Sequence, residues 1–207
     1  MGNLKVVIIN GSGGSGKDTF VKAVSMADQE IYNEKYLAST DAMYQLYYIR
    51  KKNQKPCCIL NISSIDPIKK IAKESFNWDG VKNEKSRKLL SDLKRIAIEF
   101  SDIPFDYILK KYNQTKTNDI KNNILFVHIR EIDEIEKLKT YIENDNFADV
   151  FTVLVNNPNK VHIMSNISDA NVDNYNYDIV VENDGTLKDL YEKAKKFLEI
   201  IYGYEEG

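Results

Sequence analysis

The chain has 207 residues, and its 29 basic and 31 acidic side chains leave a formal net charge of −2. That balance excludes the broad electrostatic attraction of a basic protein for nucleic acid, and no apolar stretch is long enough to span a membrane. The two cysteines, Cys57 and Cys58, are adjacent within an apolar run, which indicates thiols of a reducing compartment. With no leader pattern before the first strand, we expect one cytoplasmic α/β domain.

The first element is a strand predicted over Lys5–Asn10, rich in Val and Ile. A glycine-rich loop follows it, and a helix is predicted from Lys17 to about Glu30. The loop has the G-x-x-x-x-G-K spacing of a phosphate-binding loop. Its members are Gly11, Ser12, Gly13, Gly14, Ser15, Gly16 and Lys17.

This spacing has a physical basis. Glycines let the backbone curl so that several N–H groups point into one concavity. The helix that follows adds its own unpaired N–H groups and the positive end of its dipole. Lys17 would then contact the β- and γ-phosphates. Strand, loop, lysine and helix occur in the required order, so the sequence predicts that the chain binds a nucleoside triphosphate.

The position after the lysine departs from the usual motif, because Asp18 stands where Ser or Thr normally ligates Mg²⁺. A carboxylate also suits Mg²⁺, directly or through water. Alternatively, Asp18 is only a favourable negative charge in the first helical turn. Thr19 follows and can still reach a phosphate.

Residues 31–55 read as an insertion, with a helix predicted from Asp41 through Ile49. A second strand is predicted over Cys57–Ile62. Three helices should follow, starting at Asp66-Pro67 with Asp66 as an acidic N-cap, at an Asn83 cap, and at Asp102-Ile-Pro104.

The second half continues the alternation of strands and helices. Strands are predicted over Ile124–Ile129, Val150–Val155 and Asp178–Val181, with helices from Glu131 to about Glu143 and from Leu187 to about Tyr202. The aperiodic segment 156–177 reads as a surface loop, and Thr186 with Asp189 should cap the last helix. The pattern predicts a three-layer α/β/α fold with a five-stranded parallel sheet, and a nucleotide at the carboxyl ends of the strands.

A phosphate-binding loop alone leaves several enzyme classes open. The chain is small for a motor, and the N-K-x-D and D-x-x-G motifs of guanine-nucleotide switches do not occur in order. A nucleotide-kinase type of enzyme remains, which needs cations away from the loop to hold an acceptor. The candidates are Arg130 just after a strand, Arg87 near the start of a long helix, and Lys69, which could equally be an ordinary surface lysine.

Several segments together resemble the bacteriophage-type deoxynucleoside monophosphate kinases. They are the loop ending G-K-D-T, the segment D-P-I-K-K, the helix S-R-K-L-L-S-D-L, the arginine after a strand, and the ending Y-D-I-V-V-E-N-D-G-T. P-loop phosphomevalonate kinases are similar in the G-K-D loop and that arginine. The resemblance implies a single kinase domain that uses ATP and Mg²⁺, with a lid at 156–177 and a helical acceptor-binding region at 63–122.

The resemblance also implies roles for individual residues. Lys17, Arg87 and Arg130 would be catalytic, and Asp66, Lys69, Arg87 and Arg130 would bind the acceptor. Asn183, Asp184 and Gly185 would form a loop near the adenine, although Asn-Asp-Gly is also an ordinary tight turn. Asp18 remains the candidate metal ligand on the ground of its place after Lys17, not of the resemblance.

Two departures from the family pattern keep alternatives open. Relatives commonly carry D-T-R where this chain has His128-Ile129-Arg130, so His128 either replaces the aspartate or is a core histidine. Asn156-Asn157-Pro158 stands where relatives often place an arginine, and the lid offers only Lys160 and His162 as cations. The acceptor is therefore a (deoxy)nucleoside monophosphate or another phosphorylated small molecule such as phosphomevalonate, unless the chain binds nucleotide without catalysis.

Overall fold

The computed structural model describes residues 4–32, 48–49, 57–81, 83–117, 123–159 and 172–202. The chain forms two compact units. The first contains residues 1–61 and 118–207, and the second contains residues 62–117, which nearly coincides with the region expected to be helical. No helix among the described residues is long and apolar enough to cross a membrane.

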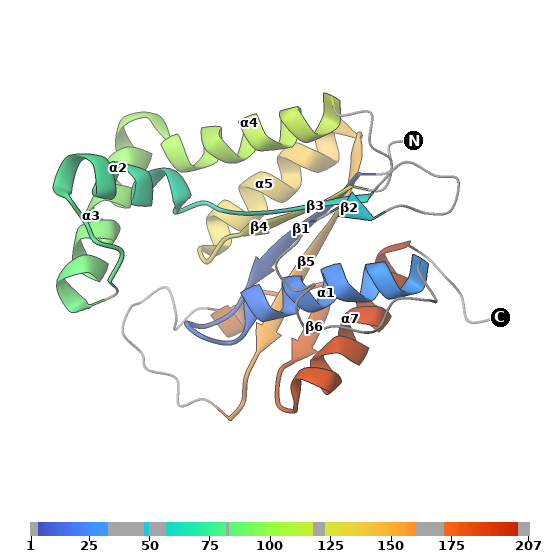
Figure 1. Cartoon of the computed structure of the whole chain (residues 1–207). Coiled ribbons are helices and arrows are strands. Elements are labelled where there is room, and N and C mark those ends of the chain that lie inside the picture. The colour runs from blue at the N-terminus through green and yellow to red at the C-terminus, as the bar shows by residue number, and fades with distance from the viewer. Residues whose placement is uncertain are drawn as a thin grey trace. The chain divides into compact units, whose positions relative to one another are not determined.

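The first unit is built on one sheet (Figure 1). Its strands lie in the order β2 (Tyr48–Ile49), β3 (Cys57–Ser63), β4 (Ile124–His128), β1 (Leu4–Asn10), β5 (Ala148–Asn156) and β6 (Ile179–Glu182). β1 runs parallel to both β4 and β5, and β6 runs parallel to β5. The expected five-stranded parallel sheet is confirmed.

β2 is a sixth strand that the sequence did not predict. It pairs antiparallel with β3, with Tyr48 opposite Cys58 and Ile49 opposite Cys57. The helix expected from Asp41 through Ile49 is therefore wrong at its end, because the last two residues extend to pair with the edge of β3. The remainder of that expected helix lies outside the described residues.

Helices cover both faces of this sheet. α1 (Lys17–Tyr32) and α7 (Leu187–Tyr202) pack together on one face, and α5 (Ile132–Asp145) packs against β5 from the other (Figure 1). Strand residues alternate between the two faces, so Val7 and Ile9 of β1 point toward α1 and α7. The three-layer arrangement is confirmed.

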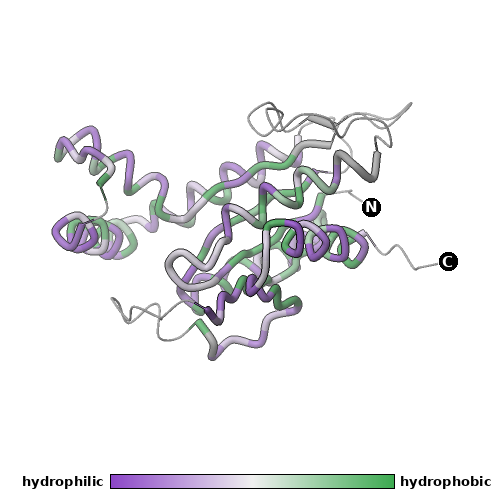
Figure 2. The backbone as a smooth tube through the Cα atoms, turned by 60° about the horizontal axis from the view of Figure 1, so that its bottom comes forward, coloured by the Kyte–Doolittle hydropathy of each residue, from purple (hydrophilic) through white to green (hydrophobic). Residues whose placement is uncertain are grey.

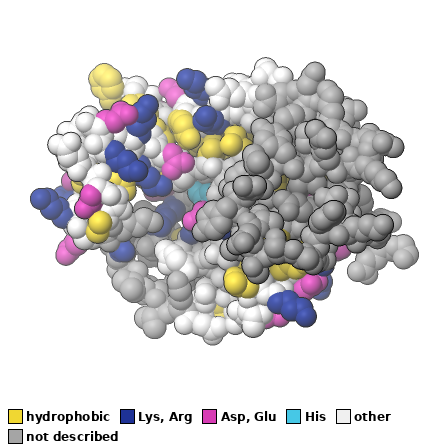
Figure 3. All heavy atoms as spheres, viewed as in Figure 1, with side chains coloured by type: hydrophobic (Ala, Val, Ile, Leu, Met, Phe, Trp, Pro, Cys, Tyr) yellow, Lys and Arg dark blue, Asp and Glu magenta, His cyan; other side chains and the backbone are white. Residues whose placement is uncertain are grey.

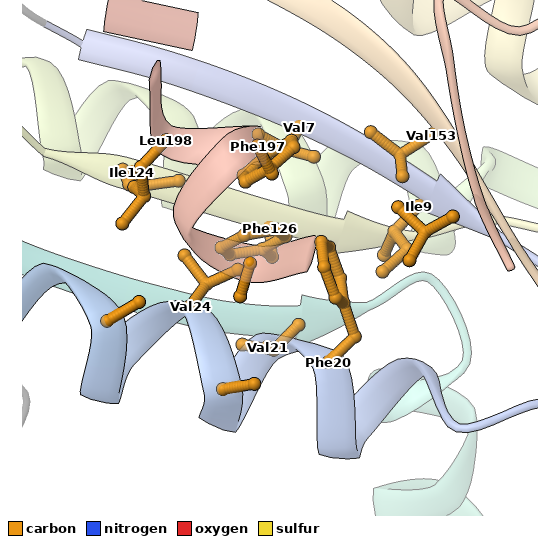
Figure 4. Packing of buried hydrophobic residues seen from close by; sticks show 14 of the residues in the cluster. Val7, Ile9, Phe20, Val21, Val24, Ile124, Phe126, Val153, Phe197 and Leu198 are labelled. Atoms are coloured by element: carbon orange, nitrogen blue, oxygen red, sulfur yellow. The ribbon is translucent and has the colours of Figure 1, made fainter. Parts of the chain in front are cut away.

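Aromatic rings lie at the centre of the core between the sheet and the two helices α1 and α7 (Figure 4). The rings of Phe20 on α1 and Phe197 on α7 have their centroids 5.3 Å apart in an edge-on arrangement, and Phe126 on β4 lies 6.1 Å from Phe197. All three side chains are almost completely buried. Figure 2 shows the corresponding pattern along the backbone, with the helices alternating between hydrophobic and hydrophilic residues.

The second unit consists of α2 (Asp66–Phe76), α3 (Glu84–Ser101) and α4 (Ile103–Thr117), which pack on one another. Exposed pairs of opposite charge, such as Arg95 with Glu99, occur one turn apart on α3. On the face shown in Figure 3, basic, acidic and apolar side chains are interspersed over α2 and α3.

Polar side chains mark the helix boundaries of this unit. The Asn83 cap is confirmed, because its side-chain oxygen accepts a hydrogen bond from the Ser86 N–H at 2.9 Å. The expected N-cap at Asp66 is wrong. Ile65 occupies the cap position and Asp66 is the first helical residue, so its carboxylate reaches back to the Ser63 N–H at 2.8 Å.

The end of the chain also follows its sequence signals. The Thr186 N–H and hydroxyl each donate to the Asp189 carboxylate at 2.7 Å, which confirms the capping pair at the start of α7. Between β5 and β6 a short 3₁₀ helix, η2, spans Val172–Asn174.

Candidate phosphate-binding site

The carboxyl ends of β1, β4, β5 and β6 meet along one edge of the sheet. Ile9 on β1 lies opposite His128 on β4 and Val153 on β5, and Asn156 at the end of β5 lies opposite Glu182 on β6. The loop from β1 to α1 leaves this edge. In open α/β sheets, ligands bind outside the carboxyl ends of the strands.

Three glycines give this loop its shape. Gly11, Gly14 and Gly16 have φ angles of 145°, 78° and 99°, which residues with side chains rarely adopt. A Cβ on Gly11 would lie 2.3 Å from the Val155 carbonyl oxygen, and one on Gly16 would lie 2.2 Å from the Asn183 amide nitrogen. Gly11 therefore requires glycine for backbone conformation and for space, and Gly16 requires it for backbone conformation.

The loop turns back on itself before α1 begins. The Ser15 N–H donates to the Ser12 carbonyl at 3.1 Å, and the Phe20 N–H donates to the Gly16 carbonyl at 2.8 Å. Gly13 and Gly14 at the crest are exposed. The first turn of a helix and the exposed crest of a glycine loop together offer backbone N–H groups to an anion.

Lys17 is folded over this loop. Its Nζ donates to the carbonyl oxygens of Gly11 at 2.6 Å and Ser12 at 2.9 Å. The ammonium group is thus held next to the backbone groups that would contact a phosphate. These carbonyls partly offset its charge, and a phosphate oxygen would be the stronger acceptor.

Asp18 and His128 lie near each other beside the loop. The Asp18 side chain is 82% exposed, and its Oδ1 is 3.8 Å from His128 Nε2. That same Nε2 is 2.7 Å from Oδ1 of Asn61 at the end of β3. The imidazole is 13% exposed and contacts polar groups, so His128 is not a histidine packed only among apolar side chains.

The described residues offer Mg²⁺ a sparse donor set. They contain no group of three or more His, Cys, Asp or Glu side chains that could hold a metal ion. Mg²⁺ in phosphoryl-transfer sites is commonly held by one or two carboxylates together with substrate phosphates and water. The open carboxylate of Asp18 fits that limited role.

Asn10 was missed by the sequence reasoning. It is fully buried at the end of β1, and its Oδ1 accepts a hydrogen bond from the Gly11 N–H at 2.7 Å. Its Nδ2 donates to the Arg130 carbonyl at 3.1 Å and contacts the Tyr177 hydroxyl at 2.7 Å. A buried polar residue directly before the first glycine was the available signal, but its partners are distant in sequence.

The loop after β6 contacts the phosphate-binding loop. The Asn183 side chain donates to the Ser15 carbonyl at 2.8 Å, and its backbone N–H donates to the Asn156 carbonyl at 2.6 Å. Asp184 pairs with Lys193 at 2.7 Å, and the hydrogen bond from that lysine holds the pKa of the Asp184 carboxyl below its usual value. A Cβ on Gly185 would lie 2.5 Å from an Asp189 carboxylate oxygen.

The remaining candidate residues divide between the two units. Arg130 is half-buried just after β4 in the first unit, whereas Arg87 is exposed near the start of α3 in the second. Asp66 and Lys69 pair with each other at 3.0 Å in the second unit. Burial, and then the charge of Asp66, raise the pKa of the nearby Tyr107 hydroxyl. The expectation that Arg87 and Arg130 share one phosphate stays a prediction.

Part of the expected lid lies outside the described residues, including Lys160 and His162. Its two ends are described. Asn159 donates to the Asp184 carbonyl at 2.9 Å, and Tyr175 and Tyr177 pack edge to face with ring centroids 4.8 Å apart.

Comparison with known proteins gives loose structural likenesses, two of which are to kinases. No family model matches the chain, and no curated protein matches it. A mutant APS kinase of Mycobacterium tuberculosis overlaps 96% of this chain and 99% of its own, with a TM-score of 0.40 and 15% identity. A sugar kinase from a Janibacter species overlaps 98% of each chain at the same TM-score and identity. Both likenesses are too weak to bear on the activity of this chain.

Proposed function

We propose that this protein is a phosphotransferase that moves the γ-phosphoryl group of ATP to a small phosphorylated acceptor, with a (deoxy)nucleoside monophosphate as the first candidate. The observation that carries the proposal is the loop between β1 and α1. Three glycines at positive φ bring its backbone to a helix N-terminus, and Lys17 is held directly over it.

The chemistry of phosphoryl transfer suits such a site. Catalysis of this reaction consists mainly of positioning the reactants and neutralising charge on the transferred group. Lys17 would contact the β- and γ-phosphates, and Arg130 would contact the acceptor phosphate with its planar, bidentate guanidinium. Mg²⁺ would supply further neutralisation when bound, with Asp18 as its protein ligand.

The acceptor assignment draws on the resemblance to nucleotide kinases rather than on the geometry. Asp66, Lys69 and Arg87 would complete the acceptor site. Another phosphorylated small molecule, such as phosphomevalonate, would need the same two features of the site. These are cationic side chains that bind its phosphate and a nucleoside triphosphate bound nearby. Recognition of the rest of the acceptor depends on shape and on one or two hydrogen bonds.

An ATP-consumption screen tests the proposal. The protein is incubated with ATP and Mg²⁺ and with each (deoxy)nucleoside monophosphate or phosphomevalonate in turn. We expect ADP to form with one acceptor class well above the rate with ATP alone. If ATP raises the melting temperature of the protein but no acceptor gives turnover, the protein binds nucleotide without catalysis. If ATP neither raises the melting temperature nor is consumed with any acceptor, the proposal is contradicted.

A variant of Arg130 tests, in the same screen, whether this arginine binds the acceptor phosphate. Arg130→Lys keeps the charge but loses the bidentate geometry, so turnover should fall about tenfold or more. Arg95→Lys is the matched control, because Arg95 is exposed on α3 and bonded to Glu99. Equal turnover in both variants would show that Arg130 does not bind the acceptor phosphate.

A further inference from the structure

The amide of Asn10 joins three segments that are far apart in sequence. It is fully buried, and its three partners are the Gly11 N–H at the start of the phosphate-binding loop, the Arg130 carbonyl after β4 and the Tyr177 hydroxyl before β6. The orientation of the amide follows from its partners. The Gly11 N–H can only donate and the Arg130 carbonyl can only accept, so Oδ1 must face Gly11.

We propose that Asn10 is a positioning residue for phosphoryl transfer, and that Tyr177 acts with it. In this role the amide fixes where the phosphate-binding loop begins relative to the chain that carries Arg130. The inference rests on the proposed function, since it assigns a role within that site. Neither Asn10 nor Tyr177 belongs to the G-x-x-x-x-G-K pattern.

The physical argument concerns buried polar groups. An asparagine amide has two N–H donors and a carbonyl oxygen, and all three are used here. In a buried position, a broken hydrogen bond leaves a polar group without a partner, which is more costly than the net gain from forming the bond. The three segments are therefore held in one arrangement, and displacement of any one of them breaks a bond of the same amide.

Tyr177 is itself held in place from a second direction. Its ring packs edge to face against Tyr175, and the Tyr175 hydroxyl donates to the Glu136 carboxylate on α5. Burial, followed by this bond to Glu136, raises the pKa of the Tyr175 hydroxyl, which is the direction expected for a phenol that donates to a carboxylate. The Tyr177 ring thus rests against the Tyr175 ring, a contact that needs neither hydroxyl, and the Tyr177 hydroxyl bonds to Asn10.

The neighbouring tyrosines provide a matched pair of variants. Tyr177→Phe removes the hydroxyl bonded to Asn10, and Tyr175→Phe removes the hydroxyl bonded to Glu136; each keeps its ring. Both variants should lower the melting temperature. Only Tyr177→Phe should also weaken ATP binding and lower kcat/KM, each by about three- to tenfold, the range expected for one hydrogen bond. Tyr175→Phe should stay within about twofold of wild type in both.

A double variant separates positioning from general destabilisation. Asn10→Ala and Tyr177→Phe remove the same bond, so their combination should weaken ATP binding no more than Asn10→Ala alone. Additive effects would overturn the proposal, as would equal effects of the two tyrosine variants on ATP binding. If Asn10→Ala does not fold, the tyrosine pair decides the question.

Failure of the proposed function gives a different result. Wild-type protein that transfers no phosphoryl group to any acceptor contradicts the proposed function alone, and the positioning role is then judged by ATP dissociation constants from calorimetry. If the ATP dissociation constant of Tyr177→Phe equals that of wild type, the positioning role is overturned. Wild-type protein that does not bind ATP overturns both.

Discussion

Asp18 combines two features that have separate physical meanings. It is a negative charge in the first turn of α1, where the helix dipole favours anions. It is also an open carboxylate beside the phosphate-binding loop, with His128 Nε2 at 3.8 Å. The first role would affect helix stability, whereas the second would affect the concentration of Mg²⁺ that the protein needs.

Replacing Asp18 distinguishes these roles. Asp18→Asn should raise the Mg²⁺ concentration for half-maximal turnover by about tenfold, because a neutral amide is a weaker ligand for Mg²⁺ than a carboxylate. Asp133→Asn is the control, since Asp133 is likewise exposed in the first turn of a helix, α5. If both variants need the same Mg²⁺ concentration for half-maximal turnover, Asp18 acts only as a negative charge at the start of the helix.

Local signals predicted the conformation of the glycine loop and two helix caps, whereas contacts between distant segments were not predicted. The glycines, Lys17 and the Asn83 and Thr186 caps act on residues within a few positions, so sequence spacing reveals them. Asn10 and Tyr177 bond across 167 positions, and His128 meets Asn61 across 67. Such contacts arise only when the sheet brings the ends of its strands together, and spacing along the chain does not encode them.

At the scale of elements, the start of α7 depends on a reciprocal cap. Thr186 donates to Asp189, and the Asp189 N–H donates back to the Thr186 hydroxyl at 3.3 Å. The bonds from the Thr186 backbone and side chain hold the pKa of the Asp189 carboxyl below its usual value. A lowered pKa in the folded state contributes stability above the unfolded pKa, and this contribution is lost as pH falls through the folded pKa.

Removing the threonine should expose this contribution. Thr186→Ala should lower the free energy of unfolding by about 1 kcal/mol at pH 7, the usual cost of a lost N-cap. The difference from wild type should narrow as pH falls below about 4, the ordinary pKa of an aspartate, and then through the lowered pKa of Asp189. Thr140→Ala on the exposed surface of α5 is the control and should not destabilise. Urea unfolding at several pH values measures both; a constant difference down to pH 3 would contradict the assignment.

Some helix ends and strand edges were not predicted from the sequence. α2, α3 and α5 are each followed by a C-cap residue at positive φ, Asn77, Asp102 and Asn146, a conformation that these residue types tolerate. β2 was missed because two residues that pair with an edge strand give no periodic signal. The Asp66 cap was misplaced by one residue, because the side chain reaches back to Ser63 rather than capping from outside the helix.

For the whole molecule, the alternation of strands and helices was sufficient to predict the fold. Apolar strands, with a phosphate-binding loop after the first of them, predicted the three-layer α/β/α fold. In the structure, β1 lies between β4 and β5 in the sheet. The acceptor side could not be derived in the same way. Arg87 and Arg130 belong to different compact units, and nothing in their local sequence encodes a shared partner.

The measurement that tests the central claim most directly is calorimetric titration of ATP with Mg²⁺ into wild-type protein, Lys17→Ala and Lys22→Ala. Lys22 is exposed on the same helix, so the two variants lose the same charge. We expect ATP to bind wild type and Lys22→Ala alike, and Lys17→Ala at least about tenfold more weakly, because only Lys17 lies over the loop. Equal ATP affinity in all three proteins would contradict the account.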